Sequence, residues 1–372
     1  MRTEHQRGSD PGRWSPRIEP AIWTEPVRGG FPDPRILSLP GIEQIRAYLH
    51  GRVPPPPPFH LMGLRMTEVA EGAVTFTMPA SEWLLPPAGF VQLGVLAILA
   101  DAALGCSIQT ALPPGQPYTT SDLSLTFLRP LRGDGGTITS RGRLIHAGSS
   151  LAVAETLMED GTGRPVAHGT TRCFLLSPID PLPEPEGMEI TDPPTTLPDD
   201  PYLRPVAGRP LAQSEWDELS GTEVLEGLGT GHLPAPPISH LTGLRVLDAE
   251  SGRATFGLPA SAWLTSPTGL IQGGAIALLA DTVLAMAAQS TCPPRTTATP
   301  LDLKVNYVRP APADGRELVG RGTVVHRGRT LAIATADLEN ADGRRVAVAS
   351  GTALIRSGPW GSGEPTAPEG ET

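Results

Sequence analysis

The sequence predicts an α+β fold with two domains in tandem, each a curled antiparallel sheet wrapped around one long hydrophobic helix. The first observation is a repeat: the stretch from His60 to Asp101 recurs from His240 to Asp281, with 21 of 42 positions identical at a constant offset of 180 residues. The second is one long apolar run with helical length in each copy, and the third is the period-2 alternation that follows it. A sheet that curls around an all-apolar helix buries that helix efficiently.

The repeat also sets the domain boundaries. At the same offset, Leu128-Arg129-Pro130 pairs with Val308-Arg309-Pro310, and the alignment needs no insertion, so a whole domain was duplicated. We expect a disordered arm over 1–35, copy one over 36–177, a Pro- and acid-rich linker over 178–210, copy two over 211–357 and a loose tail over 358–372.

Within copy one, the patterns predict the elements in order. A short amphipathic helix over 41–50 and a Pro-rich loop precede a strand pair at 64–69 and 73–78. A long apolar helix follows over 92–112, and Pro113-Pro114 stops it. Gly-rich turns then separate four strand-like runs, at 119–127, 137–146, 150–159 and 166–176.

Composition restricts the class of protein. Apolar residues make up 39 % of the chain, which is enough for packed cores, and the net charge of −10 argues against nucleic acid as a partner. The three cysteines, Cys106, Cys173 and Cys292, are too few and too scattered for a disulfide framework or a zinc site. Buried free thiols fit a reducing cytoplasm, and we expect no metal and no other cofactor.

Two apolar stretches, 90–112 and 270–291, are long enough to raise the question of membrane spans. Each carries an Asp near its middle, and a carboxylate is costly at the centre of a bilayer. The first 30 residues also lack the apolar core of a secretory signal. We therefore expect buried helices in a cytoplasmic protein that has no membrane span.

A family resemblance becomes specific where the long helix of copy two begins. This copy reads Pro267-Thr268-Gly269-Leu270-Ile271-Gln272-Gly273-Gly274 and continues to Leu279-Ala280-Asp281. The stretch resembles the signature of the hotdog-fold acyl-CoA thioesterases of the phenylacetate-degradation type, in which a Gly precedes His-Gly-Gly and the helix reaches Leu-Ala-Asp. The runs 301–310 and 325–332 are similar to a central strand and a hairpin of that family. The resemblance covers both copies and implies two hotdog domains that hydrolyse an acyl-CoA to free acid and CoA.

The physical chemistry of the motif fits this activity. A Gly-Gly opening allows close approach of a ligand, and the free N–H groups of a helix N-terminus stabilise negative charge on a thioester oxygen. The Asp follows nine residues later, roughly 13 Å along the axis, so one domain cannot easily direct both groups at one carbonyl. The resemblance implies that the donor of one domain serves the Asp of the other. A tandem chain forms that pair internally as a pseudo-dimer. We therefore expect either a monomer or a homodimer of two such chains.

The two crosswise sites that result are unequal in sequence. Site one combines Asp101 and Thr120 with Gln272 and Gly273, whereas site two combines Asp281 and Pro300 with Gln92 and Leu93. The family's His is Gln in both sites. Only site one keeps a hydroxyl where the family has Ser, and only site one keeps the first Gly. We therefore expect site one to be competent and site two degenerate, so that loss of Asp101 abolishes hydrolysis.

The resemblance assigns roles to these residues. Asp101 acts on water as a general base or attacks directly, Thr120 positions the water, and the Gly273 N–H holds the oxygen while Gln272 assists. Asp281 is the equivalent candidate in site two. Substrate binding is expected from Gln92, Gly94 and Gly274, and from Arg327 and Arg329 toward the CoA phosphates.

Structural interpretations of the same residues stay open. In these interpretations the Asp residues are buried with structural partners and the Gln residues cap helices. Thr120 is then an ordinary strand hydroxyl, and the two Arg residues lie in a solvated turn. Two other functions also stay open. One is a non-catalytic acyl-CoA-binding or regulatory protein. The other is an enoyl-CoA hydratase-type enzyme, which is disfavoured because 89–112 and 269–292 contain no His.

Overall fold

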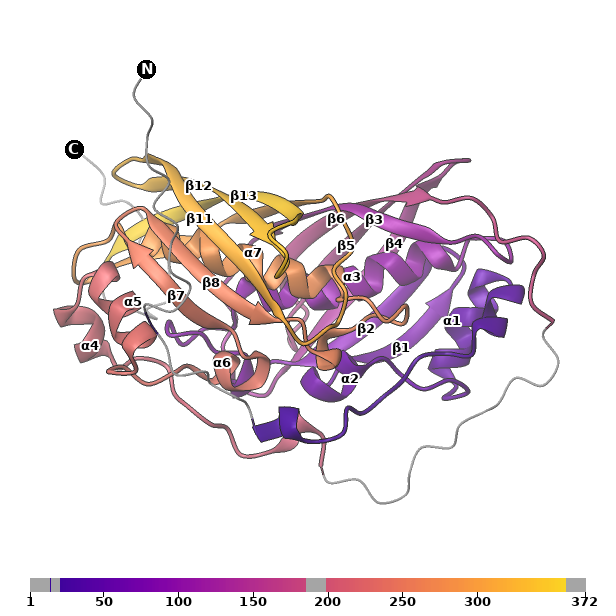
Figure 1. Cartoon of the computed structure of the whole chain (residues 1–372), viewed down its shortest axis with the longest axis horizontal. Helices are drawn as coiled ribbons and strands as arrows, with labels where there is room; N and C mark the ends of the chain where they lie inside the picture. Colours follow the sequence, from indigo (N-terminus) through magenta and orange to yellow (C-terminus); the bar gives the residue numbers. More distant parts are fainter. Residues whose placement is uncertain (1–13, 15–20, 185–198, 359–372) are drawn as a thin grey trace.

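The computed structural model of the chain describes residue 14 and residues 21–184 and 199–358. Within these ranges thirteen strands form a single sheet, and two long helices lie against its concave side (Figure 1). Each half of the sheet curls around one helix. The predicted tandem of two hotdog domains is therefore confirmed.

Copy one has the predicted order of elements. Its long helix, α3, is Leu93–Gln109, and its sheet half begins with a strand pair and continues after α3. The complete set is α1 Gly41–Leu49, α2 Pro57–Met62, β1 Arg65–Ala70, β2 Ala73–Pro79, α3, β3 Tyr118–Phe127, β4 Thr137–Ala147, β5 Leu151–Glu159 and β6 Pro165–Leu175. The sequence did not predict α2, which lies inside the Pro-rich loop.

Copy two repeats this order with one interruption. The strand that corresponds to β3 is divided into two, and the break follows Pro300. Its elements are α4 Gln213–Glu218, α5 Gly221–Thr230, α6 Pro237–Thr242, β7 Arg245–Glu250, β8 Arg253–Pro259, α7 Gly273–Gln289, β9 Thr296–Pro300, β10 Asp302–Tyr307, β11 Glu317–Arg327, β12 Leu331–Glu339 and β13 Arg345–Ser357. Proline cannot donate a ladder hydrogen bond, which accounts for the interruption.

The two long helices form the centre of the core. Each has 17 residues and one charged side chain, Asp101 in α3 and Asp281 in α7, and most of the other side chains are fully buried. The helices pack against each other as well as against the sheet. Among the described residues, no helix combines the length and the apolar character that a membrane crossing requires.

The halves of the sheet join edge to edge through β3 and β10. Asp302 pairs with Thr126, and Asn306 pairs with Asp122. Because these two pairs exchange under the 180-residue offset, the junction has the symmetry of a two-fold dimer interface. The central pair of the junction is Lys304 with Ser124, which occupy equivalent positions in the two copies.

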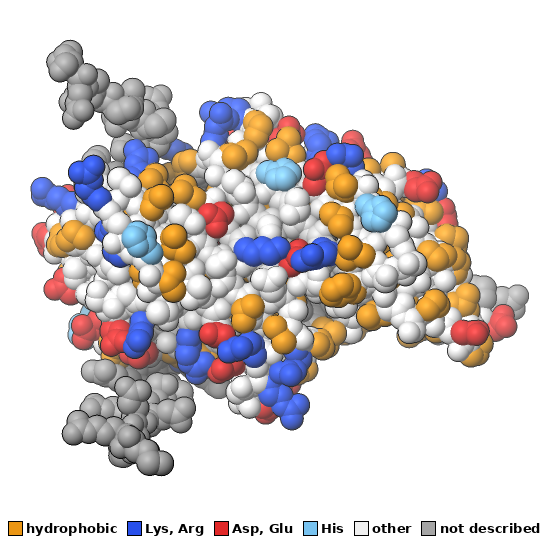
Figure 2. Space-filling view, turned by 90° about the horizontal axis from the view of Figure 1, so that it is seen from above, with side chains coloured by type: hydrophobic (Ala, Val, Ile, Leu, Met, Phe, Trp, Pro, Cys, Tyr) orange, Lys and Arg blue, Asp and Glu red, His pale blue; other side chains and the backbone are white. Residues whose placement is uncertain are grey.

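The outer face of the sheet has a mixed character. Figure 2 views the molecule from above and shows Lys, Arg, Asp and Glu side chains interleaved with hydrophobic ones. The Lys304 ammonium lies 3.2 Å from the buried carboxylate of Asp122, which Arg172 also contacts, so an ion pair spans the junction between the copies.

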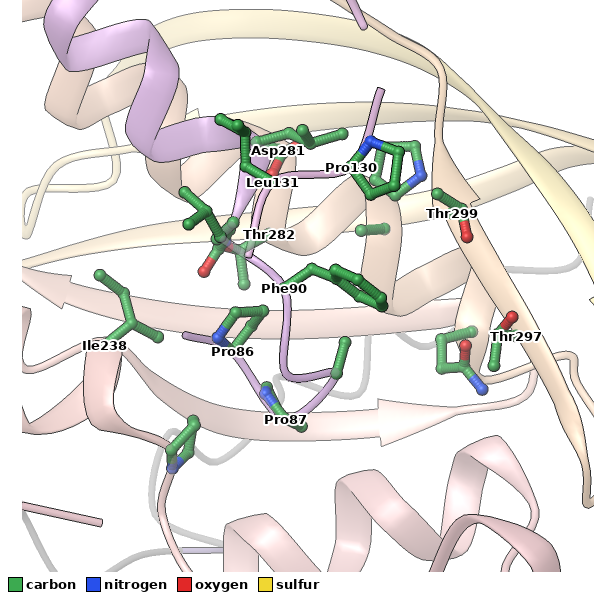
Figure 3. A pocket seen from close by; sticks show the side chains of 18 of the residues that line it. Pro86, Pro87, Phe90, Pro130, Leu131, Ile238, Asp281, Thr282, Thr297 and Thr299 are labelled. Atoms are coloured by element: carbon green, nitrogen blue, oxygen red, sulfur yellow. The ribbon is translucent and has the colours of Figure 1, made fainter. Parts of the chain in front are cut away.

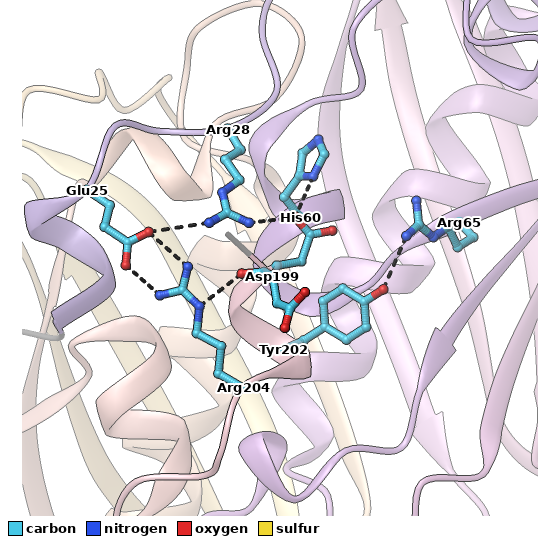
Figure 4. Close-up of polar contacts among 8 residues, drawn as sticks. Glu25, Arg28, His60, Arg65, Asp199, Tyr202 and Arg204 are labelled. Carbon is cyan, nitrogen blue, oxygen red and sulfur yellow. Dashed lines mark hydrogen bonds and ion pairs between the residues drawn. The ribbon is translucent and has the colours of Figure 1, made fainter. Parts of the chain in front are cut away.

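Parts of the expected arm and linker are ordered against both copies, and Trp23 lies against Gly243 of copy two. Arg28 is only 4 % exposed, and its guanidinium donates to Asp200 at 3.0 Å, while Arg204 donates to Glu25 (Figure 4). Asp200 is also 3.0 Å from Nδ1 of His60 in α2. The sequence predicted a loose arm over 1–35 and an unfolded linker over 178–210, but residues 21–35 and 199–210 hold defined positions. The expected tail beyond Gly358 lies outside the described residues.

Candidate active site

The two long helices contact each other so that each N-terminus meets the Asp of the opposite helix. The Gly274 N–H donates to Asp101 Oδ2 at 3.0 Å, and the Gly94 N–H donates to Asp281 Oδ2 at 2.8 Å. These bonds are equivalent under the 180-residue offset. The structure therefore brings together the crosswise pairs that the resemblance implied, and it uses the second Gly of each motif rather than the first.

Close approach of the helices explains why the second position is Gly in both copies. A Cβ on Gly274 would lie 2.4 Å from Ile98 Cα, and a Cβ on Gly94 would lie 2.9 Å from Leu278 Cα. Either contact is far inside van der Waals distance. By contrast, a Cβ on Gly273 would lie 3.3 Å from the Asp101 carboxylate oxygens, a contact that small shifts can relieve.

The two glutamines make different contacts. Gln272 Nε2 donates to the Ile98 carbonyl at 3.2 Å, and its Oε1 is buried without a hydrogen-bond partner among the described residues. Gln92 Nε2 instead donates to Thr282 Oγ1, which in turn donates to the Leu278 carbonyl at 2.8 Å. Neither glutamine caps its helix through its side chain.

Site one is closely packed around its helix start. Tyr307 donates from its hydroxyl to the Gly273 carbonyl at 2.8 Å, and its ring lies against the position that a Cβ on Gly273 would take. Thr120 Oγ1 is 3.8 Å from the sulfur of Cys173. Asp101 itself is partly exposed.

Site two opens into a cavity of about 2040 Å³ that lies between the copies. Asp281, Gln92 and Leu93 line it together with Pro300, whereas neither Asp101 nor Gly273 does. Figure 3 shows Asp281 and Thr282 on one side of this space, with Phe90 of copy one projecting into it. Although Leu93 replaces a Gly, the N–H of a first helical residue has no partner within its helix and stays a donor.

Burial makes both carboxyls weaker acids than an exposed Asp. It raises the pKa of Asp281 to about 7 and that of Asp101 to about 6. The hydrogen bonds from Gly94 and Gly274 and those from the glutamines lower the two pKa values, but burial is the larger effect. A carboxyl with a pKa near neutrality is suited to general-base catalysis.

Other predicted residues lie away from the helix starts. Arg327 donates to Thr291 Oγ1 at 2.9 Å, which places it past the C-terminal end of α7, and neither it nor Arg329 lines the cavity. His240 does line the cavity, and burial lowers its pKa. His60 belongs to the polar contacts of the linker.

Sequence reasoning missed Thr282, and it missed Arg129 and Arg132 at the rim of the cavity. Thr282 orients Gln92, and Ala102 stands at the equivalent position of copy one, so a comparison of the copies could have found it. Arg129 and Arg132 are exposed residues of the cavity lining, and neither makes an ion pair with a described residue. The described residues contain no group of three His, Cys, Asp or Glu side chains that could hold a metal.

Comparison with known proteins finds the same family in each copy. A model of the Thioesterase superfamily matches residues 88–167 and matches again at residues 268–347. Each match covers the loop before the long helix, the helix itself and the strands that follow. Each copy thus contains a domain that matches the Thioesterase superfamily, and the chain has the fold of a tandem hotdog protein.

Individual relatives agree with this fold. A Halobacterium salinarum protein named as an esterase of unproven activity is 33 % identical over 99 residues, which span 25 % of this chain and 64 % of that protein. A thioesterase of unproven activity from Novosphingobium aromaticivorans aligns over 78 % of this chain and 98 % of its own, with a TM-score of 0.50 and 17 % identity. A hotdog-fold protein of unknown function from Alicyclobacillus acidocaldarius aligns over 79 % and 96 %, with a TM-score of 0.50 and 12 % identity.

Proposed function

We propose that this protein hydrolyses an acyl-CoA thioester, with Asp281 as the general base of site two. One observation carries the proposal: the Asp281 carboxylate is part of the wall of the large cavity and is held at the N-terminus of the opposite long helix. A thioester carbonyl bound there would lie between a base and the Leu93 N–H, which has no partner within its helix. The match of each copy to the Thioesterase superfamily supports the same reaction.

The proposed reaction has two steps. Asp281 accepts a proton from a water molecule while the water oxygen forms a bond to the acyl carbon. The Leu93 N–H and the dipole of α3 stabilise the negative charge on the thioester oxygen. The carbon–sulfur bond then breaks, the charge returns to a carbonyl, and the proton moves from Asp281 to the departing thiolate.

Site one is the alternative place for the same chemistry. It retains Thr120 and Gly273, and the free Oε1 of Gln272 offers an acceptor for a bound water. Thr120 and Gly273 supported the sequence-based prediction that Asp101 is the essential residue, which stays a prediction. We favour site two because the cavity gives it room for an acyl group.

The test is thiol release from a panel of acyl-CoA thioesters. Loss of a positioned general base costs about a hundredfold or more, so Asp281→Asn should lower kcat by at least that factor. Asp101→Asn is the matched control, because it removes the equivalent charge from the equivalent helix, and we expect it to keep most activity. The reverse result would assign the chemistry to site one, as the sequence argument predicts, and equal losses would contradict both assignments.

A binding protein is the second candidate function. Pro300 removes the hydroxyl of site two, and Gln replaces the family's His in both sites. These two losses favour a cavity that holds an acyl-CoA without cleaving it. Binding of acyl-CoA without release of thiol by the unmodified chain would support this function. We propose the cytoplasm as the compartment, in keeping with three free cysteines.

A further inference from the structure

The cavity of site two extends along α7, well beyond Asp281. Its lining follows the helix from Asp281 through Met286 to Gln289. Leu228 of α5 and Ala298 of β9 contribute further apolar wall. At about 2040 Å³ its volume is about twice the upper end of the usual range for small-molecule sites. The catalytic end therefore occupies only a small part of the space.

Copy one carries larger side chains at the equivalent positions. Under the 180-residue offset, Ala298 corresponds to Tyr118 and Leu228 corresponds to Tyr48. The strand register is the same in both copies, since Tyr118 pairs with Leu175 and Ala298 pairs with Ile355. Because register and pleat agree, the two side chains point in the same direction relative to their long helices.

Tyr118 fills the space that is open in copy two. Its hydroxyl donates to the Gly105 carbonyl at 3.0 Å and lies 3.1 Å from the position of a Cβ on Gly105. The residue equivalent to Gly105 is Ala285, which lines the cavity. The ring of Tyr118 thus lies along α3 in the place where copy two leaves a channel along α7. Both tyrosines are half-buried, and burial raises the pKa of both hydroxyls.

We propose that the channel along α7 binds a long, apolar acyl chain, and that Ala298 and Leu228 are the residues that admit it. Tyr118 and Tyr48 then close the equivalent channel of copy one, whereas the channel of copy two stays open. The placement of the thioester group at Asp281 rests on the proposed function, whereas the binding of the hydrocarbon chain does not. Each methylene buried in the channel should tighten binding about fourfold until the channel is full.

The test measures binding with S-alkyl-CoA thioethers, which contain no thioester to hydrolyse. Dissociation constants for chains of four to eighteen carbons should fall steadily with length in the unmodified protein. Ala298→Tyr should weaken binding of the sixteen-carbon thioether by about a hundredfold and leave the four-carbon thioether unchanged, because only the distal channel is closed. Leu228→Tyr closes the channel from its other wall and should act in the same direction.

Both substitutions introduce residues that the equivalent fold of copy one already accommodates, and circular dichroism would confirm folding. Tyr118→Phe, which keeps the ring in copy one, is the control and should leave the dependence on chain length intact. Affinity that does not change with chain length in the unmodified protein would overturn the proposal. So would equal losses for short and long thioethers in both tyrosine variants.

The outcome separates this inference from the proposed function. Binding that depends on chain length, in a chain that never releases thiol, would retain the acyl channel and reject hydrolysis. Rapid thiol release with no dependence of binding on chain length would reject the channel and retain hydrolysis.

Discussion

At the scale of single residues, Thr282 accounts for the different contacts of Gln272 and Gln92. In site one Gln272 reaches the Ile98 carbonyl directly, because copy one has Ala102 at the position equivalent to Thr282. In site two the Thr282 hydroxyl stands between Gln92 and the equivalent carbonyl of Leu278. Gln92 lines the cavity together with Asp281, whereas Gln272 does not.

The pKa of Asp281 predicts how hydrolysis depends on pH. Burial raises this pKa to about 7, and only the ionised carboxylate accepts a proton from water. Below pH 7, kcat/KM should therefore fall about tenfold for each unit of pH, and it should level off above pH 8. A pH profile of thiol release checks this. If Asp101 were the base instead, the midpoint would lie near its own pKa of about 6.

The resemblance paired each candidate Asp with the helix start of the opposite copy, but it did not reveal which of the two sites opens into a cavity. Site two has the cavity, and copy two has the small Ala298 where copy one has Tyr118. These two residues lie on strands far from the motif. A single sequence does not reveal that these positions face the same channel until the register of the strands is known.

At the scale of elements, the crossing of α3 and α7 depends on two glycines. Gly94 and Gly274 each allow a backbone N–H to reach the opposite carboxylate, and each lies where a Cβ would meet the other helix. The contact thus couples the geometry of the sites to the packing of the core.

Substitution of these glycines should separate packing from helix propensity. Gly274→Ala should destabilise the protein by roughly 1–3 kcal/mol, because its Cβ would overlap Ile98 at 2.4 Å. Gly273→Ala is the matched control on the adjacent residue, where the nearest atoms are 3.3 Å away. Gly273→Ala should lose little stability, since Ala also favours the helix. Urea unfolding of both variants measures the difference, and a greater loss for Gly273→Ala would contradict this account of the crossing.

Most elements were predictable, and the exceptions have local causes. The long helices and the alternating strands carry strong periodic patterns, and their observed bounds lie within a few residues of the predicted ones. The helices α2 and α6 have six residues each, too few to show a period, and both begin with Pro at the first position. Proline suits that position because its fixed φ is helical and its missing N–H costs nothing there. Pro-rich sequence therefore concealed two helix starts.

At the scale of the whole molecule, the duplication provides both stability and function. The junction of β3 with β10 makes one continuous sheet, and the crossing of α3 with α7 makes one core. The family resemblance, applied to the repeat, implied that the two domains pair internally. It could not predict that residues 21–35 and 199–204 pack on the pair, since their Arg and Glu side chains show no period and pair only through the fold.

The distribution of charge over the molecule leads to a last prediction. The chain has a net charge of −10, so an anionic carrier such as CoA needs a local basic surface to approach. Arg129 and Arg132 supply one at the exposed rim of the cavity. Replacing both by Ala should raise KM for an acyl-CoA roughly tenfold, since hydrogen bonds to charged groups are worth more than neutral ones, with kcat little changed.

The matched comparison uses the basic turn that the sequence suggested. Arg327 and Arg329 lie past the C-terminal end of α7, outside the cavity lining, so their replacement by Ala should leave KM unaltered. A thioester of N-acetylcysteamine, which lacks the phosphates, should be hydrolysed equally by all the variants. If the Arg327 and Arg329 variant alone raises KM for the acyl-CoA, the nucleotide binds at that turn and the rim has no role. If KM rises for the phosphate-free thioester too, the rim arginines act on the acyl site itself rather than on the carrier.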